Sequence, residues 1–198
     1  LEQLPLTIIS IDGAEADDIM AYIWRQLLTT QRITLVSTDK DFYQLIDDRI
    51  TVWSPTKKVE YTPDKIKNEF GISSSNFLTY RIMAGDTSDN IGGIAGAGLK
   101  SIKKYVPLIV ENEKFDVKEL IKFAESVDSK FKLVQTIKNS MFLVKRNYLL
   151  MQLASVDISN HIKLRVQEAI NRKVPHLVKY RFSTMFIQFY SVFNGTTL

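Results

Sequence analysis

The sequence predicts an α/β fold in its first half and an all-helical second half. Short β-branched, apolar runs alternate with helical patterns up to about residue 84, which favours a mostly parallel sheet flanked by helices. Beyond Gly98 no run is typical of a strand, and long amphipathic patterns predict helices. Three acidic clusters stand where predicted strands give way to helices, the place where open α/β sheets hold their ligands.

Each element of this fold is marked by its own pattern. The α/β part is expected to contain strands at 6–11, 33–37 and 50–53, an edge strand at 57–61, and helices at 14–28, 41–46, 62–71 and 73–84. Thr62 and Pro63 are a cap and a first helical residue, and Gly71 is a helix stop. The helical part is expected to contain helices at 99–111, 116–126, 128–154 and 162–172.

Composition restricts the class of protein. The chain has 198 residues, of which 45% are hydrophobic and 11% aromatic, enough for a packed core rather than disorder. It has no cysteine, which excludes disulfides and thiolate sites, and its two well-separated histidines disfavour a histidine-rich metal site, so any metal is expected to be held by oxygen. No apolar run approaches the roughly 20 residues that cross a membrane. These features favour a cytoplasmic protein without a membrane partner.

Charge is distributed unevenly along the chain. Residues 1–99 carry 9 Lys and Arg against 14 Asp and Glu, whereas residues 100–198 carry 17 against 8. An acidic half joined to a basic half is typical of a catalytic centre beside a surface that binds a polyanion. Lysine-rich helices with solvated faces would produce the same bias.

The three acidic clusters are candidate metal ligands. They contribute seven carboxylates: Glu15, Asp17, Asp18, Asp39, Asp41, Asp86 and Asp89. Crowded carboxylates repel one another unless a cation neutralises them, and Mg²⁺ prefers such oxygen ligands. Taken alone, the first cluster suits the first turn of a helix, the second suits an N-cap, and the third suits a turn. Their common order and the glycine-rich sequence that follows favour a metal site.

A glycine-rich loop follows the third cluster directly. Gly92, Gly93, Gly96 and Gly98 precede a helix that carries Lys100, Lys103 and Lys104. Backbone amides and lysines in this arrangement can hold a nucleic-acid backbone without reading its sequence. A flexible loop is the alternative. The loop lacks the order of a P-loop or of a dinucleotide fingerprint, so neither ATP nor NAD is indicated.

The order and spacing of these motifs resemble those of the 5′-nuclease or flap endonuclease family. The resemblance lies in GAEADDIMAYI at 13–23, LVSTDKDFYQLIDDRITVWSP at 35–55 and YRIMAGDTSDNIGGIAGAGLKSIKKY at 80–105. Phage ribonuclease H and 5′-3′ exonuclease enzymes belong to this family, as does the 5′-nuclease domain of bacterial DNA polymerase I. Lys145-Arg146-Asn147 and the residues after it look more like the phage branch, which would place the protein in the cytoplasm of an infected bacterium.

The resemblance implies the C-terminal part of a PIN-like flap endonuclease fold. It implies an α/β metal-binding portion at 1–84, a helix-three-turn-helix that binds DNA at 85–110, and a helical region at 111–198. It also implies two Mg²⁺ ions, for which Mn²⁺ can substitute, and a K⁺ at the helix-three-turn-helix. The implied substrates are flapped double-stranded DNA or an RNA–DNA hybrid, cut by two-metal hydrolysis during DNA replication, with RNase H-type primer removal included.

The resemblance also assigns roles to residues. The catalytic carboxylates would be those of Glu15, Asp17 and Asp39 at the first metal, with Asp18 in support, and of Asp41, Asp86 and Asp89 at the second. DNA contacts would come from Lys40, Arg81, Gly92, Gly93, Gly96, Gly98, Lys100, Lys103 and Lys104. Lys40 and Arg81 could equally form structural ion pairs.

Members of this family carry further metal aspartates and catalytic basic residues upstream of the matching stretch. We therefore expect a truncated enzyme, one half of a split nuclease completed by a separate N-terminal polypeptide, or a non-catalytic DNA-binding subunit or relic. The first two are favoured, and the isolated chain is not expected to cleave at full rate. A structural calcium domain is disfavoured because no EF-hand spacing occurs.

An aromatic stripe lies near the end of the sequence. Its members are Phe182, Met185, Phe186, Phe189, Tyr190 and Phe193. Helical spacing of this kind favours packing against earlier helices. If exposed, the stripe would bind a replication partner such as a single-strand-binding protein or a sliding clamp.

Overall fold

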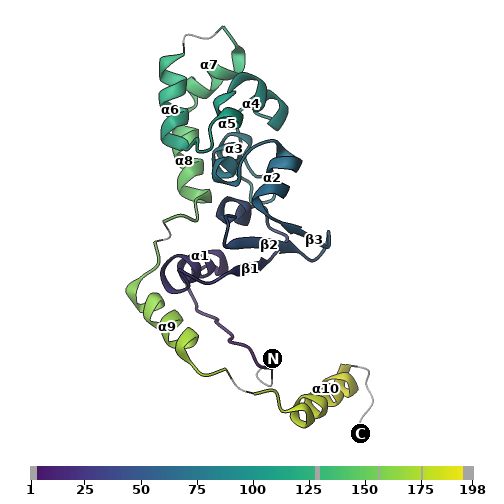
Figure 1. Cartoon of the computed structure of the whole chain (residues 1–198). Coiled ribbons are helices and arrows are strands. Elements are labelled where there is room, and N and C mark those ends of the chain that lie inside the picture. The colour runs from purple at the N-terminus through teal and green to yellow at the C-terminus, as the bar shows by residue number, and fades with distance from the viewer. Residues whose placement is uncertain (1–3, 128–129, 156, 175, 194–198) are drawn as a thin grey trace. The chain divides into compact units, whose positions relative to one another are not determined.

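A computed structural model describes residues 4–127, 130–155, 157–174 and 176–193 (Figure 1). Backbone contacts divide the chain into two units. Unit 1 combines Leu1–Leu27 with Asp157–Leu198, and unit 2 is Leu28–Val156. Each unit is described by itself below.

Unit 2 contains a three-stranded sheet in the order β1-β2-β3. Its strands are β1 Ile33–Val36, β2 Ile50–Ser54 and β3 Val59–Tyr61. β1 and β2 are parallel, and β2 and β3 are antiparallel. The strands predicted at 33–37, 50–53 and 57–61 are confirmed, but the sheet is mixed rather than mostly parallel. A short turn between β2 and β3, with Lys58 in the left-handed region at φ 55°, permits only an antiparallel return.

Helices pack on this sheet and build the aromatic core of unit 2. They are the 3₁₀ helix Asp41–Leu45, α2 Pro63–Phe70, the 3₁₀ helix Ser74–Asn76 and α3 Phe77–Ala84. As predicted, Thr62 caps α2 by accepting from the Lys65 amide at 3.2 Å, and Gly71 ends it at φ 70°. Tyr43 stacks on Tyr61 with ring centroids 4.4 Å apart. This ring pair joins the 3₁₀ helix to the sheet.

The rest of unit 2 is helical, as predicted, with no strand among its described residues. The helices are α4 Leu99–Tyr105, α5 Leu108–Glu111, α6 Val117–Ser126, α7 Lys132–Asn139 and α8 Met141–Met151. The helix predicted at 99–111 is broken at Val106, because a residue before proline avoids the helical region and Pro107 follows. The helix predicted at 128–154 is broken at Ser140, and residues 128–129 lie outside the described residues. α8 packs along α3 (Figure 1).

Unit 1 combines the start of the chain with its end. It contains α1 Ala16–Tyr22, a π-helical turn at Ile23–Leu27, α9 Asn160–Asn171 and α10 Lys179–Phe193. Gln167 on α9 donates a hydrogen bond of 2.8 Å to the hydroxyl of the buried Tyr22 and so joins the two ends.

The strand predicted at 6–11 is wrong. The described residues of this segment form no ladder with another strand, and Leu6 and Ile8 are 39% and 49% exposed. A β-branched run becomes a strand only where a partner pairs with its backbone. Instead, residues 6–8 border a cavity of about 220 Å³ beside the end of α9.

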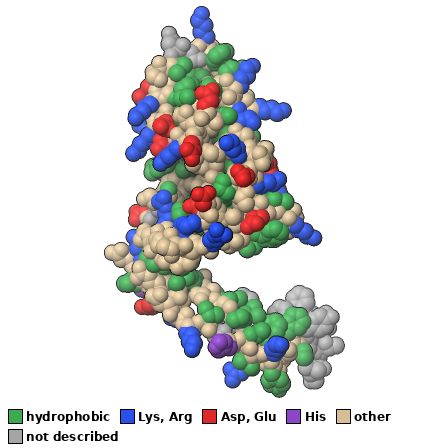
Figure 2. Space-filling view, viewed as in Figure 1, with side chains coloured by type: hydrophobic (Ala, Val, Ile, Leu, Met, Phe, Trp, Pro, Cys, Tyr) green, Lys and Arg blue, Asp and Glu red, His purple; other side chains and the backbone are tan. Residues whose placement is uncertain are grey.

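Surface charge, the length of the apolar helices and the aromatic stripe each bear on what the chain could bind. On the face of unit 2 drawn in Figure 2, acidic and basic side chains are interspersed. Among the described residues, no helix is both long enough and apolar enough to span a bilayer. Of the aromatic stripe, Phe186 is 57% exposed, and the side chains of residues 188–193, including Phe189, Tyr190 and Phe193, lie outside the described ones.

Candidate metal and nucleic-acid site

Two of the three acidic clusters meet in unit 2. Asp41 begins the 3₁₀ helix that follows β1, and Asp86 and Asp89 lie in the turn that follows α3. Each of these three residues offers a carboxylate oxygen, and these oxygens all lie within 4.8 Å of one another. Residues separated by some 45 positions are therefore brought together, as the order of the clusters predicts.

Local hydrogen bonds fix the turn that carries Asp41. The Asp39 amide donates to the Ser37 hydroxyl at 3.1 Å, and the Asp41 amide donates to Asp39 Oδ1 at 2.8 Å. The Asp39 carboxylate thus forms a local turn with the amide of the first residue of the 3₁₀ helix. The N-cap position itself is Lys40, without a side-chain cap, so Asp39 is not the N-cap.

The second turn is closed like a miniature hairpin. Asp86 and Ile91 exchange two backbone hydrogen bonds, of 2.8 and 2.7 Å, around residues 87–90. The Ser88 amide donates to Asp86 Oδ1 at 2.9 Å, and the Ser88 hydroxyl also donates to that oxygen. Asp86 is only 8% exposed, so this turn presents a buried and oriented carboxylate.

Arg81 from α3 lies between the two clusters. Its Nε and Nη2 each lie 2.9 Å from Asp41 Oδ1, and its Nη2 also forms an ion pair with Asp86 Oδ2. The side chains of Arg81, Asp41 and Asp86 are only 12%, 15% and 10% exposed. The structural ion pair raised as an alternative for Arg81 is therefore present.

The charges in this cluster do not balance. Burial raises the pKa of Asp41 above its ordinary value, the Arg81 guanidinium acts in the opposite direction, and neighbouring Asp39 and Asp89 add to the rise. One guanidinium faces three carboxylates, so the cluster retains excess negative charge. Hard divalent cations prefer such an arrangement of oxygens, and Mg²⁺ needs only one or two carboxylates together with water and phosphate. The residues present fit a divalent cation.

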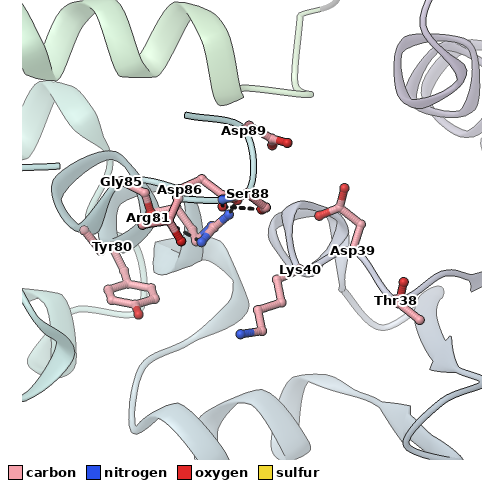
Figure 3. Close-up of a pocket in the computed structure, with 11 residues that line it drawn as sticks. Thr38, Asp39, Lys40, Tyr80, Arg81, Gly85, Asp86, Ser88 and Asp89 are labelled. Atoms are coloured by element: carbon pink, nitrogen blue, oxygen red, sulfur yellow. Dashed lines mark hydrogen bonds and ion pairs between the residues drawn. The ribbon is translucent and has the colours of Figure 1, made fainter. Parts of the chain in front are cut away.

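A cavity of about 630 Å³ opens beside these carboxylates. Figure 3 shows Thr38, Asp39 and Lys40 on one side of it and Arg81, Asp86, Ser88 and Asp89 on the other. Lys40 therefore lies where a phosphate could approach the acids. The cavity can admit a polar ligand to the carboxylates without any movement of the sheet.

The first acidic cluster lies in unit 1. Glu15 is the N-cap of α1, and Asp17 and Asp18 lie in its first turn, where the helix dipole favours negative charge. Burial and the nearby Glu15 raise the pKa of Asp18 above its ordinary value. Their participation in a metal site with the acids of unit 2 stays a prediction.

The glycine-rich loop packs tightly against the end of α3. A Cβ added to Gly93 would lie 2.1 Å from the Ala84 carbonyl oxygen, and one added to Gly85 would lie 2.4 Å from the Gly93 nitrogen. The Ile94 amide donates to the Met83 carbonyl at 2.8 Å. An amide of the loop thus donates a hydrogen bond to a carbonyl in the last turn of α3 that has no partner within the helix.

The lysines after the loop differ from one another. Lys103 Nζ donates to the Phe70 carbonyl at 3.1 Å, so it supports the C-terminus of α2. Lys100 is exposed, and Lys104 Nζ lies 5.1 Å from the ring centroid of Tyr105. Of the three lysines expected at DNA, Lys103 therefore has a structural contact as well.

Sequence reasoning did not single out several residues that shape this site. Ser88 orients Asp86, and Thr38 and Tyr80 line the cavity. Asn147, on α8, is completely buried and donates to the carbonyls of Ile82 and Gly92 at 3.0 and 2.9 Å. The position of Asn147 among the apolar residues of 141–151 was the available signal that its side chain is buried and bonded.

Known proteins share sequence with much of this chain. The family model of the 5′-3′ exonuclease N-terminal resolvase-like domain matches residues 1–71. A 5′-3′ exonuclease of Buchnera aphidicola is 37% identical over 110 residues, which are 53% of this chain and 38% of that protein. A 5′-3′ exonuclease of Aquifex aeolicus is 30% identical over 66% of this chain and 48% of its own length. DNA polymerase I of Mycobacterium bovis is 33% identical over 54% of the chain and 12% of that protein. The chain thus spans less than half the length of each of these three relatives.

Solved structures extend the likeness to the fold. A mutant of T5 5′-exonuclease superposes with a TM-score of 0.69 and 25% identity, over 82% of this chain and 67% of that one. The T5 D15 flap endonuclease in a complex with DNA and metal ions has a TM-score of 0.62 and 25% identity, over 84% of this chain and 57% of that one. The chain has the same α/β fold with a small mixed sheet. In sequence and in fold the chain is similar to 5′-3′ exonucleases and flap endonucleases.

Proposed function

We propose that this chain is part of a divalent-metal-dependent 5′ nuclease that cuts flapped DNA or RNA–DNA hybrids during replication. The observation that carries the proposal is the meeting of Asp41, Asp86 and Asp89 within 4.8 Å, in a chain similar to this family. The turn that carries Asp86 and Asp89 leads directly into the glycine-rich loop, which is proposed to bind phosphate and packs against the end of α3. This arrangement suits hydrolysis of a phosphodiester held by its backbone.

Particular residues have proposed roles in this reaction. Asp41, Asp86 and Asp89 would hold one divalent ion, and Glu15, Asp17, Asp18 and Asp39 are the proposed ligands of a second. Bound Mg²⁺ or Mn²⁺ would supply an activated water and neutralise the charge that develops on the phosphate. Lys40 and Arg81 would orient the phosphate. The amides of the glycine-rich loop, with Lys100 and Lys104, would hold the duplex, and a K⁺ would bind at this loop.

We also propose that cleavage at full rate needs ligands and basic residues beyond those named above, supplied by a further N-terminal stretch or by a complementing polypeptide. The working location would be the cytoplasm of a bacterium or of a phage-infected bacterium. An exposed aromatic face on α10 would suit a single-strand-binding protein or a sliding clamp as a partner.

The alternative function is that of a non-catalytic DNA-binding subunit. The ion pairs of Arg81 with Asp41 and Asp86 favour it, because they partly neutralise the acids without a metal. Under this alternative the acids have a structural role and DNA binding is the whole activity.

Single-turnover cleavage of a labelled 5′-flap substrate, with the protein in excess and Mg²⁺ present, separates the two functions. The Asp41→Asn/Asp86→Asn double variant should lose cleavage while it retains salt-sensitive DNA binding. Asp64→Asn is the matched control, because it removes an exposed carboxylate on α2. If the native chain binds the flap but cuts none of it even at excess, the non-catalytic function is correct. Cleavage at an ordinary enzyme turnover would instead refute the need for further residues.

A further inference from the structure

We propose that Arg81 is the resident cation of the acidic cluster in the metal-free protein and that a divalent ion must displace its guanidinium to bind. This inference rests on the proposed function, since it takes Asp41 and Asp86 as metal ligands. It adds that the affinity for metal is set by competition with a side chain of the same site. Arg81 thereby becomes a positioning residue that acts through the carboxylates.

The contacts of Arg81 show why it suits this role. Nε and Nη2 both lie 2.9 Å from Asp41 Oδ1, Nη2 also pairs with Asp86 Oδ2, and Nη1 donates to the Gly85 carbonyl at 3.4 Å. All three nitrogens of the guanidinium are therefore engaged with the acids or with the turn that carries them. A planar, permanently charged fork holds carboxylates in this way better than a lysine does. With its side chain only 12% exposed, Arg81 is largely shielded from water and salt.

The two oxygens of Asp86 make the competition unavoidable. Oδ1 already accepts from both the amide and the hydroxyl of Ser88, whereas Oδ2 is the oxygen that Arg81 holds. A cation that ligates Asp86 would bind at Oδ2, because Oδ1 already accepts two hydrogen bonds. At Oδ2 it would meet the guanidinium of Arg81, and two cations beside one oxygen repel each other strongly in a site of low exposure. This repulsion is the basis of the competition between the metal and Arg81.

Removing the guanidinium should have opposite effects on stability and affinity. The metal-free protein loses the cation that relieves repulsion among its carboxylates, so its melting temperature falls. The metal no longer has to break charge-assisted hydrogen bonds, so its dissociation constant falls, by about tenfold or more. A merely structural arginine would lower stability without tightening metal binding.

Mn²⁺ titration by calorimetry, with parallel melting curves in EDTA and in saturating Mn²⁺, tests this inference on the intact chain. Arg81→Gln should bind Mn²⁺ about tenfold more tightly than the native protein and gain more melting temperature from it. Arg81→Lys, which keeps the charge, should stay near the native affinity. Arg49→Gln is the matched control, because Arg49 donates to the carbonyls of Leu28 and Gln31 at 2.9 Å and holds no carboxylate there.

A second measurement needs no variant. In EDTA the Arg81 Nε–H, which is bonded to Asp41, should give a side-chain NMR signal protected from exchange with water, and Mg²⁺ should remove that protection. An unchanged signal at saturating Mg²⁺, or an Arg81→Gln protein that binds Mn²⁺ no better than the native one, overturns the inference. Asp86→Asn separates the two proposals: if it leaves Mn²⁺ binding intact, the metal site of the proposed function itself is wrong.

Discussion

Replacement of Asn147 by leucine tests the contact that holds the glycine-rich loop to the end of α3. Asn147 is completely buried, and its amide donates to the carbonyls of Ile82 and Gly92 at 3.0 and 2.9 Å. Leucine has a similar branched shape but no donor. The Ile82 carbonyl would then be left buried without this partner, the part-buried Gly92 carbonyl would lose one hydrogen bond, and the loop would lose its tie to α8.

The expected cost follows from these two bonds. A buried polar group without a partner costs about 1–3 kcal/mol, and carbonyls lie toward the lower end because they tolerate under-satisfaction better than amides do. One such carbonyl, together with the loss of one part-buried hydrogen bond worth about 1 kcal/mol, gives roughly 2–3 kcal/mol. At roughly 2–4 °C per kcal/mol for a chain of this size, the melting temperature should fall by about 5–10 °C.

Urea unfolding followed by fluorescence measures this loss in unit 2. Trp53 lies on β2, so a Trp24→Phe background makes it the reporter of that unit. Lys145→Leu is the matched control, since it adds the same residue at an exposed position of α8. The reasoning is refuted if Asn147→Leu stays within about 0.5 kcal/mol of the native protein, or if Lys145→Leu is destabilised as much.

Three further predictions concern other parts of unit 2. Gly93→Ala should cost about 2 kcal/mol or more, because its Cβ would collide with the last carbonyl of α3, whereas Gly92→Ala, whose Cβ meets nothing within 4 Å, should melt like the native protein. Burial, and then the neighbouring Tyr61 hydroxyl, raise the pKa of Tyr43. The contribution of this raised pKa to the free energy of unfolding is present below pH ~10 and is lost as the pH rises above it. In an alkaline titration followed by tyrosinate absorbance, Tyr43→Phe should show one fewer tyrosine that ionises only at high pH. Lys103→Met should lower stability by about 0.5–1 kcal/mol with an unchanged salt slope of DNA binding; a smaller slope would show a phosphate contact instead.

The strands and helices of unit 2 were predictable wherever one pattern dominated. β-branched runs marked β1 and β2, and Thr62-Pro63 with Gly71 marked both ends of α2. The segment 6–11 has the same local pattern but forms no ladder among the described residues. Pairing depends on a partner that a local pattern does not specify. For the same reason the direction of β3, set by the turn at Lys58, was not predicted.

The candidate site was predictable in part. The family resemblance grouped Asp41, Asp86 and Asp89 together, and the structure brings their carboxylates within 4.8 Å of one another. A structural ion pair of Arg81 was raised as an alternative, but its partners were not predicted, because Asp41 is 40 positions away along the chain. Long-range polar contacts of this kind depend on tertiary packing, as do those of Asn147.

The loop from Gly85 to Gly98 is tied to α3 by hydrogen bonds, which restrict its motion and its length. Its amides at Gly85 and Ile94 bond to carbonyls of α3, and Asp86 is bonded to Ile91 across the acidic turn. Amide hydrogens at these positions should exchange with solvent as slowly as those inside a helix. Insertions between Gly85 and Ile94 would break these bonds. A segment without regular structure is thus as constrained in length as a helix, and the acidic turn moves with α3.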